Sequence, residues 1–505
     1  SMQGCRAVSR RVTPAMASAS SRSVFDRAFL EACPKDWDPK DWVDQAWEGE
    51  RNAGVGGDLE EGERVEGNAD QVLEKAPVRL APFCTHLASV WGLLTRTHKP
   101  QLSSSLLTVP HPMVVPGGRF REQYYWDTYW VILGLLRSGL PEVARGLVTN
   151  FVHLVETVGL IPNGNRCYYV NRSQPPLLAA MVGAVVAAGA AHAGDLAVWV
   201  KAIDKEYQFW TEERSVVVKG ARLARYDSGP NYDTSYGPRP ESYPHDMETA
   251  EGIEGPEREQ LFRHIMAACE SGWDFSSRWM TGGATLASIS TTGIVPVDLN
   301  CYMFRVEEVA ASLHRRLGAT AVAQRYEEAA RARARALHEL CWNNNTHCWH
   351  DLDAATGDQR PGIYPSNWAP LWATTESSIP FDLPDGVAEA SVGGLEKSGL
   401  LCSSGILTST YVSGEQWDAP NLWAPLQHLV VVGLAQVPGR GAELARDLAT
   451  RWVNVCDQAW QKEGYLLEKY AADGDAGLGG EYEVQIGFGW TNGVALDLVA
   501  RGLVD

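Results

Sequence analysis

A segment in the first third of the chain combines residue types that bind sugars. Residues 116–130 contain two Arg, a Glu, an Asp, a Phe, three Tyr and two Trp. Flat aromatic rings cover the apolar C–H faces of a pyranose, while guanidinium and carboxylate groups hydrogen-bond its hydroxyls. Gly117 and Gly118 let the backbone turn sharply before Arg119. The composition predicts a sugar-binding loop, and a core segment rich in aromatic residues is the alternative.

Similar loops recur far along the chain. Each couples a turn-forming residue to a polar or charged group, usually near an aromatic residue. Functional side chains commonly lie on loops that a rigid scaffold brings together, so the recurrence predicts one site assembled from many connections. The other loops are 161–166, 172–176, 237–242, 270–276, 416–425 and 487–493.

Two acidic residues have sequence surroundings that suit the hydrolysis of a glycosidic bond, which needs one carboxyl group to donate a proton and another to activate water or attack the sugar. Asp274 lies in a Gly-Trp-Asp-Phe-Ser sequence, whose aromatic residues would restrict water and raise the pKa of an acid. Glu468 precedes Lys469, which would favour the ionised carboxylate if the two side chains approach. Taken singly, a helix-capping Asp and a surface Glu remain the alternatives.

The overall charge favours a neutral ligand. The chain of 505 residues has 62 Asp and Glu against 44 Lys and Arg, a net charge of −18. This charge opposes binding to nucleic acid or to anionic membranes. No run approaches the roughly 18 apolar residues that span a bilayer, so we expect a soluble protein. Nineteen Trp residues are consistent with extensive apolar contacts or stacking surfaces.

The cysteine and glycine patterns argue against several other kinds of site. Ten scattered cysteines predict free buried thiols. Residues 341–350 contain two Cys and two His, but their spacing matches no standard zinc pattern, so we expect a tight turn after a helix. The Gly-rich segments 477–480 and 487–489 lack the strand and helix of a βαβ unit, which argues against dinucleotide binding.

Helical periodicity dominates from about residue 79 onward, and strand-like alternation is scarce and short. Helices joined by loops rich in Gly, Pro and polar residues predict an all-α architecture of antiparallel pairs around a centre. If such pairs close into a ring, many loops converge at one end. The helical patterns cover 84–97, 126–138, 141–158, 176–191, 194–211, 256–269, 299–317, 320–341, 421–435, 440–457 and 490–502.

The amino-terminal region is predicted to lie outside the fold. Residues 1–25 are basic, rich in Ser and free of acidic residues, which resembles a transit peptide or its remnant; a basic tail is the alternative. No apolar core of a secretory signal is evident, and the location stays open between the cytosol and an organelle. Residues 51–68 are predicted to form a flexible, acidic surface insertion.

Three of these segments together resemble the signature sequences of the trehalases of glycoside hydrolase family 37. They are 112–130, 416–425 and 481–492, and the resemblance extends from about residue 81 to residue 500. It implies an (α/α)6 barrel, with 26–505 as a single catalytic domain. It also implies hydrolysis of α,α-trehalose to two glucose molecules with inversion, and no metal or organic cofactor.

The resemblance also implies roles for individual residues. Asp274 corresponds to the general acid and Glu468 to the general base. The Gly-rich loop, residues 471–480, is shorter and more acidic here than is common in the family, a difference that bears on the mobility of the loop and the affinity for substrate. The residues implied to contact the sugar are Arg119, Phe120, Tyr124, Trp126, Asp127, Asn163, Arg172, Gln174, Arg239, Glu241, Gly272, Trp417 and Glu481.

Two rival functions fit part of the same pattern. Another inverting glycosidase or a disaccharide phosphorylase on a similar barrel would also use aromatic loops and acidic residues, and phosphorolysis would further require a phosphate pocket. A non-catalytic sugar-binding protein would fit the loops, although the retention of both Asp274 and Glu468 argues against it. The oligomeric state stays open.

Overall fold

The computed structural model describes the strand Leu59–Glu61 and residues 65–98, 106–228, 239, 242–282, 285–375, 377–379, 381, 383–480 and 483–505. The predicted tail 1–25 and the predicted sugar contacts Glu241 and Glu481 lie outside the described residues. Most of the predicted insertion 51–68 also lies outside them.

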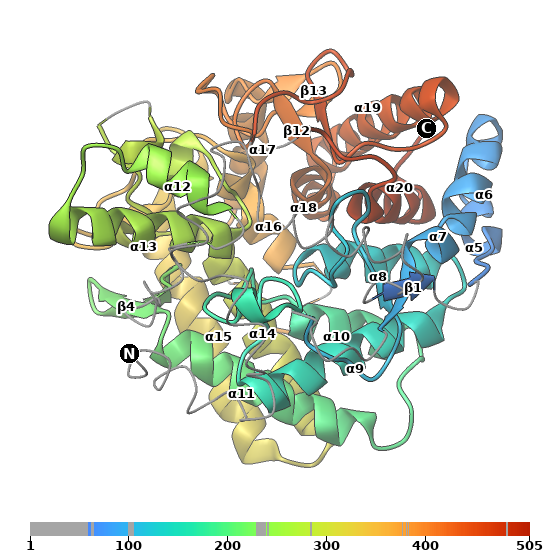
Figure 1. Cartoon of the computed structure of the whole chain (residues 1–505), viewed down its shortest axis with the longest axis horizontal. Helices are drawn as coiled ribbons and strands as arrows, with labels where there is room; N and C mark the ends of the chain where they lie inside the picture. Colours follow the sequence, from blue (N-terminus) through green and yellow to red (C-terminus); the bar gives the residue numbers. More distant parts are fainter. Residues whose placement is uncertain are drawn as a thin grey trace, which may run out of the picture.

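Among the described residues, six helices form a closed inner ring. Consecutive members contact one another in the order α8, α10, α14, α16, α18 and α20, and α20 returns to contact α8. Their side chains are largely buried, and every residue of α18 is buried. Figure 1 shows α8, α14, α16, α18 and α20 towards the middle of the molecule. The six are Asp127–Arg137 (α8), Leu178–Ala187 (α10), Val297–Arg316 (α14), Ala369–Ala373 (α16), Ala424–Leu434 (α18) and Gly489–Ala500 (α20).

A second set of helices packs outside this ring. Each precedes or follows an inner helix in the chain, and α6, α11 and α19 lie well out from the middle in Figure 1. Outer helices are amphipathic: α19 buries Leu444, Leu448 and Trp452 on one face and exposes charged residues on the other. The described outer helices are Ala81–Ser89 (α6), Pro141–Val158 (α9), Asp195–Glu212 (α11), Thr320–Ala336 (α15), Val387–Lys397 (α17) and Arg440–Glu463 (α19).

This arrangement is an (α/α)6 barrel, and the predicted all-α class is confirmed. Because an outer helix returns the chain between successive inner helices, the inner helices run in the same direction and begin at the same end of the barrel. The loops that precede them therefore converge there. The same end collects the amino termini of the helices, whose partial positive charges favour nearby carboxylates.

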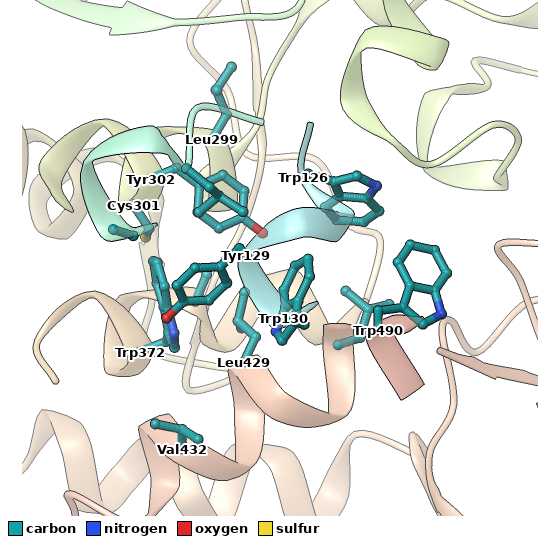
Figure 2. Close-up of a cluster of buried hydrophobic side chains, with 14 of the residues drawn as sticks. Trp126, Tyr129, Trp130, Leu299, Cys301, Tyr302, Trp372, Leu429, Val432 and Trp490 are labelled. Atoms are coloured by element: carbon teal, nitrogen blue, oxygen red, sulfur yellow. The ribbon is translucent and has the colours of Figure 1, made fainter. Parts of the chain in front are cut away.

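Aromatic side chains fill the barrel below this end (Figure 2). Trp126 lies edge-on to Trp130 and to Trp490, with ring centroids 5.4 and 5.7 Å apart. Trp372 of α16 packs edge-on against Tyr129 and Tyr302. Four of the inner helices thus contribute rings to one packed core, which forms a rigid floor beneath the converging loops.

The remaining elements are short. Strands are few and short, as predicted, and the described pairs are antiparallel. The strands are Leu59–Glu61 (β1), Thr95–His98 (β2) and Met113–Val114 (β3) in one sheet, and the pairs Ser215–Val218 with Ala221–Ala224 (β4, β5), Ile294–Val295 with Leu352–Asp353 (β6, β9), Trp342–Asn343 with Cys348–Trp349 (β7, β8), Leu401–Cys402 with Gly405–Ile406 (β10, β11) and Asn421–Trp423 with Lys469–Ala471 (β12, β13). The other α-helices are Asp70–Leu73 (α5), Trp91–Leu94 (α7), Tyr243–Thr249 (α12) and Gly255–Ser271 (α13).

Most predicted helices are present, with shifted ends. The pattern over 84–97 is divided among α6, α7 and β2, and the pattern over 320–341 ends in a π-helical turn, Leu337–Cys341. Helices α12, α16 and α17 were not predicted, because α12 and α16 span 7 and 5 residues, too few for a clear period, and α17 follows a Pro-rich loop. Residues 341–350 form the predicted turn, as the β7–β8 hairpin.

The described cysteines carry free thiols, as predicted, although Cys167 and Cys402 are only half-buried. No helix in the described part of the chain is long and apolar enough to cross a membrane.

The contact between α8 and α20 depends on a glycine. A Cβ atom at Gly493 would lie 2.0 Å from the carbonyl oxygen of Trp130. Gly493→Ala should therefore separate the two helices and lower the free energy of unfolding by about 1–3 kcal/mol, measured as a lower melting temperature by circular dichroism. The control is Gly183→Ala in α10, whose Cβ would lie 3.6 Å from Val309 and which should leave stability unchanged or higher. Equal melting temperatures for the two variants would contradict the close-packing argument.

Candidate active site

A cavity opens where the loops before the inner helices converge. It holds about 820 Å³ of space, including its mouth, within the ~300–1,000 Å³ of small-molecule sites. All of the predicted site residues that the structure describes line this cavity. They are Arg119, Phe120, Tyr124, Trp126, Asp127, Asn163, Arg172, Gln174, Arg239, Gly272, Asp274, Trp417 and Glu468.

Asp274 lies in the loop between α13 and α14, and its side chain is half-buried. Gly272 ends α13 in the left-handed conformation, with φ of 75°. A Cβ at this position would lie 2.7 Å from the Trp126 ring, so only glycine lets the loop approach the aromatic wall. The backbone is held from the other side by Gln416, whose Nε2 donates to the Asp274 carbonyl at 2.6 Å.

The carboxylate of Asp418 fixes the residues that follow Asp274. Asp418 is fully buried and accepts hydrogen bonds from the backbone N–H of Ser277 at 2.6 Å and from the hydroxyls of Ser276 and Ser277 at 3.0 and 2.8 Å. The Ser413 hydroxyl donates to the same carboxylate. Trp417 N–H also donates to the carbonyl of Phe275 at 3.0 Å. We call Asp418 and these three serines the Asp418 clamp.

Glu468 lies immediately before β13 and is 2% exposed. Its backbone N–H donates to the Gln485 carbonyl at 2.9 Å, and its own carbonyl accepts from the Trp490 indole at 3.0 Å. The β12–β13 pair then places Lys469 opposite Trp423. Glu468 is therefore buried next to a short strand, and the alternative of a surface Glu is excluded.

Lys469 is buried beside both acidic residues. Its Nζ donates to Gln416 Oε1 at 2.9 Å and to the Gly479 carbonyl at 2.8 Å. Burial lowers the pKa of Lys469 to about 8, while the charges of Glu468 and Asp274 oppose that decrease. Lys469 thus interacts electrostatically with both carboxyl groups and is hydrogen-bonded to the loops around them.

A third carboxyl group, Asp127, lies in the first turn of α8 and is 5% exposed. Burial raises its pKa well above the usual range, and the charges of Glu468 and Asp274 add to the increase. The helix amino terminus, through the N–H of Asp127 itself, acts in the opposite direction. The balance favours the neutral carboxylic acid, which can donate as well as accept a hydrogen bond.

Aromatic rings form the walls of the cavity. Trp417 stacks on Trp423 with centroids 3.9 Å apart and planes within 3° of parallel. Trp417 also stacks on Trp273 and contacts Trp126. Across the cavity, Phe120 lies edge-on to Tyr124. Flat surfaces of this kind suit the C–H faces of a sugar ring.

Two arginine side chains add directional polar contacts. Arg239 donates through Nε and Nη2 to Asp246 and lies over the Phe275 ring at 5.1 Å. Arg172 lies 4.9 Å from the centre of the Tyr169 ring. Such contacts fix the plane of a guanidinium group and hence the directions of its N–H donors. These two cationic groups therefore present fixed hydrogen-bond donors at the cavity.

Several lining residues were not predicted. Gln416, Trp423, Phe488 and Trp490 lie inside loop sequences that had already been singled out, so their position in these motifs was the available signal. Tyr169, Ser242 and Cys269 also line the cavity. Tyr169 occupies a 3-10 turn next to Arg172, and nothing in its local sequence distinguishes it from a core tyrosine.

The family model and the curated relatives point to the same family. The model of the trehalase family matches residues 56–501. Human trehalase is 41% identical over 454 residues, covering 86% of this chain and 75% of that protein. A periplasmic trehalase of Escherichia coli is 38% identical, covering 82% and 73%.

The fold has a counterpart among solved structures. Neutral trehalase Nth1 from Saccharomyces cerevisiae superposes with a TM-score of 0.63 at 24% identity, covering 83% of this chain and 79% of that one. With the family match over most of the chain, these findings assign its membership: the chain belongs to the trehalase family of glycoside hydrolases.

Proposed function

We propose that this protein hydrolyses α,α-trehalose to two glucose molecules with inversion, with Asp274 as the general acid and Glu468 as the general base. Asp274 protonates the glycosidic oxygen. Glu468 removes a proton from a water molecule that attacks the opposite face of the anomeric carbon. A separation of about 6.5–9.5 Å between the two carboxyl groups leaves room for that water molecule.

The observation that best supports this proposal is the meeting of two carboxyl groups with different surroundings in one aromatic cavity. Asp274 is half-buried and open to the cavity, whereas Glu468 is almost fully buried. Both act electrostatically on Lys469 and on Asp127, so both lie close to the same two groups. Two acids with distinct environments are what a division into acid and base requires.

The neighbouring charged groups would assist this division. Lys469 carries a positive charge at neutral pH and stabilises a nearby ionised carboxylate. Asp127 in its neutral form adds no third negative charge and can donate a hydrogen bond to a sugar hydroxyl. Arg119, Arg172 and Arg239 would hold further hydroxyls while the tryptophan walls exclude water.

The roles of the two acids can be tested by substitution. Asp274→Ala and Glu468→Gln should each lower the turnover of trehalose by at least about 100-fold, because each removes a proton transfer. Turnover is measured as glucose released, and circular dichroism checks the fold. Asp358→Ala, on a carboxylate with 78% of its side chain exposed, is the control and should keep wild-type turnover. Near-normal turnover in either active-site variant removes that residue from its role.

The stereochemistry can be tested by following the anomers during the first minutes of the reaction by proton NMR. Attack of water from the opposite face converts one α-linked glucose into the β anomer, while the departing glucose stays α. We therefore expect equal initial amounts of α- and β-glucose. Two α-glucose molecules would indicate retention instead. Release of glucose 1-phosphate in phosphate buffer would indicate phosphorolysis.

We predict that Asp418 positions Asp274 from a distance, without contacting the substrate. Asp418→Asn has nearly the same shape but replaces one acceptor oxygen by a donor, so it cannot accept both from the N–H of Ser277 and from the hydroxyls of Ser276 and Ser277 on the other oxygen. Asp274 should then lose its alignment, and kcat should fall by about 10–100-fold with little change in KM. The control is Asp447→Asn on the exposed face of α19, which should change neither constant. A rise in KM alone would contradict the positioning role.

A further inference from the structure

A second cavity is lined in part by residues that follow Asp274 in the chain. It holds about 830 Å³ of space, including its mouth. Asp351 and residues from three stretches of chain line it: 277–280, shortly after Asp274, 360–364, before α16, and 411–413, before Trp417. The two cavities share no lining residue in the described part of the chain.

Two tyrosines give this cavity a flat aromatic face. The rings of Tyr364 and Tyr411 are stacked, with centroids 6.3 Å apart and planes 28° from parallel. Tyr364 is 6% exposed, whereas Tyr411 is 46% exposed. An exposed ring that rests on a buried one is a rigid platform for the C–H face of a sugar.

The polar groups around this platform suit hydroxyls better than ions. Arg278 is neutralised by Asp298 and Asp351, with which it forms hydrogen bonds of 2.7–3.0 Å. Arg360 donates from Nη2 to the carbonyls of Arg278 and Met280. Among the described residues, no acceptor is hydrogen-bonded to Arg360 Nε or Nη1, so these donors face the cavity or solvent.

The hydroxyls of Ser277 and Ser413 complete the lining. Both donate to Asp418. The Ser413 oxygen accepts from the Glu415 N–H at 3.1 Å, and Ser277 is also hydrogen-bonded to Tyr364. Because a hydroxyl oxygen has two lone pairs, each serine keeps one acceptor position for a ligand. Fixed donors on Arg360 and fixed acceptors on the serines match the alternating hydrogen-bonding capacity of a sugar rim. The charges of Arg278 and Arg360 are balanced by those of Asp298 and Asp351, so the cavity, with its aromatic platform, fits a neutral sugar better than an anion or a cation.

Hydrogen bonds connect the walls of this cavity to the segment that carries Asp274. Ser277 and Ser413 belong to the Asp418 clamp, which also holds Ser276, two residues after Asp274. Gly414, next to Ser413, contacts the Gly-rich loop, because a Cβ at Gly479 would lie 2.5 Å from the Gly414 carbonyl oxygen. A ligand in the second cavity would thus contact two of the serines that hold the segment after Asp274.

We propose that the second cavity binds a glucopyranose ring, stacked on Tyr411 and hydrogen-bonded by Arg360, Ser277 and Ser413. The ring is supplied either by free glucose or by one half of a trehalose molecule. Binding at this site does not require hydrolysis, so the inference goes beyond the proposed reaction and can be tested without it.

The first experiment observes Tyr411 directly by fluorine NMR of the full chain labelled with 3-fluorotyrosine. The resonance that disappears in Tyr411→Phe identifies this residue. Titration with glucose should shift it saturably, with a dissociation constant on the order of 1–10 mM for a ligand of this size. Trehalose is titrated into the Glu468→Gln variant, which should leave the sugar intact. A shift with glucose, with trehalose or with both identifies the source of the ring.

The matched ligand is sorbitol, which has the hydroxyls but no ring and should shift the resonance only weakly. A shift with sorbitol at the affinity of glucose would overturn the stacked-ring assignment. The absence of a saturable shift with either sugar would overturn the site itself. The glucose arm uses the wild-type chain, so it remains decisive even if the proposed hydrolysis proves wrong.

The second experiment counts bound glucose by equilibrium dialysis with radiolabelled sugar. Tyr411→Ala should lose one glucose per chain, while Tyr411→Phe, which keeps the ring, should lose none. Val217→Ala, at a residue with 59% exposure on β4, is the control for an exposed substitution. Melting temperatures confirm that the variants are folded. An unchanged count in Tyr411→Ala would contradict the proposal.

Discussion

The structure depends on the closure of the inner ring, where α8 packs against α20 although more than 350 residues separate the two helices in the chain. Gly493 lets the helix backbones approach, and Trp130 and Trp490 pack near the junction. Closure turns a series of helical pairs into a barrel with no free edge. It also brings the loop at residue 119, before α8, against Gln485, whose side chain accepts from the Arg119 N–H at 2.8 Å. Without this contact the two ends of the site would lie apart.

Closure creates an electrostatic problem, because three carboxyl groups then line one cavity. Each carboxyl group is stabilised by different surroundings. Asp127 favours its neutral form, because burial and its two acidic neighbours raise its pKa. Lys469 supplies a buried positive charge that faces Glu468 and Asp274. Asp274 keeps partial contact with solvent, and the Asp418 clamp holds the residues that follow it. The inner helices add their amino termini around the same point.

Much of the fold could be predicted from the sequence, because long amphipathic helices carry their period in their own residues. The pattern over 141–158 has the same bounds as α9. The prediction failed for a helix that matters to the fold but is too short to show a period. The five residues of α16 form a full member of the inner ring, although they are too few to show a period and follow Pro365 and Trp368. Their helix is stabilised by contacts with α14 and α18, which no local sequence reveals.

For the site, too, one part could be predicted from the sequence and another could not. The sequence by itself determined which residue types gather in the first cavity, since every predicted contact that the structure describes lines it. Only the tertiary structure decided how these residues are held. Lys469 is adjacent to Glu468 in sequence, but its hydrogen bonds go to Gln416 and Gly479. Tyr364 and Tyr411, 47 positions apart, form one platform. The reason is physical: residue chemistry is local, whereas burial, charge balance and stacking depend on distances that only ring closure defines.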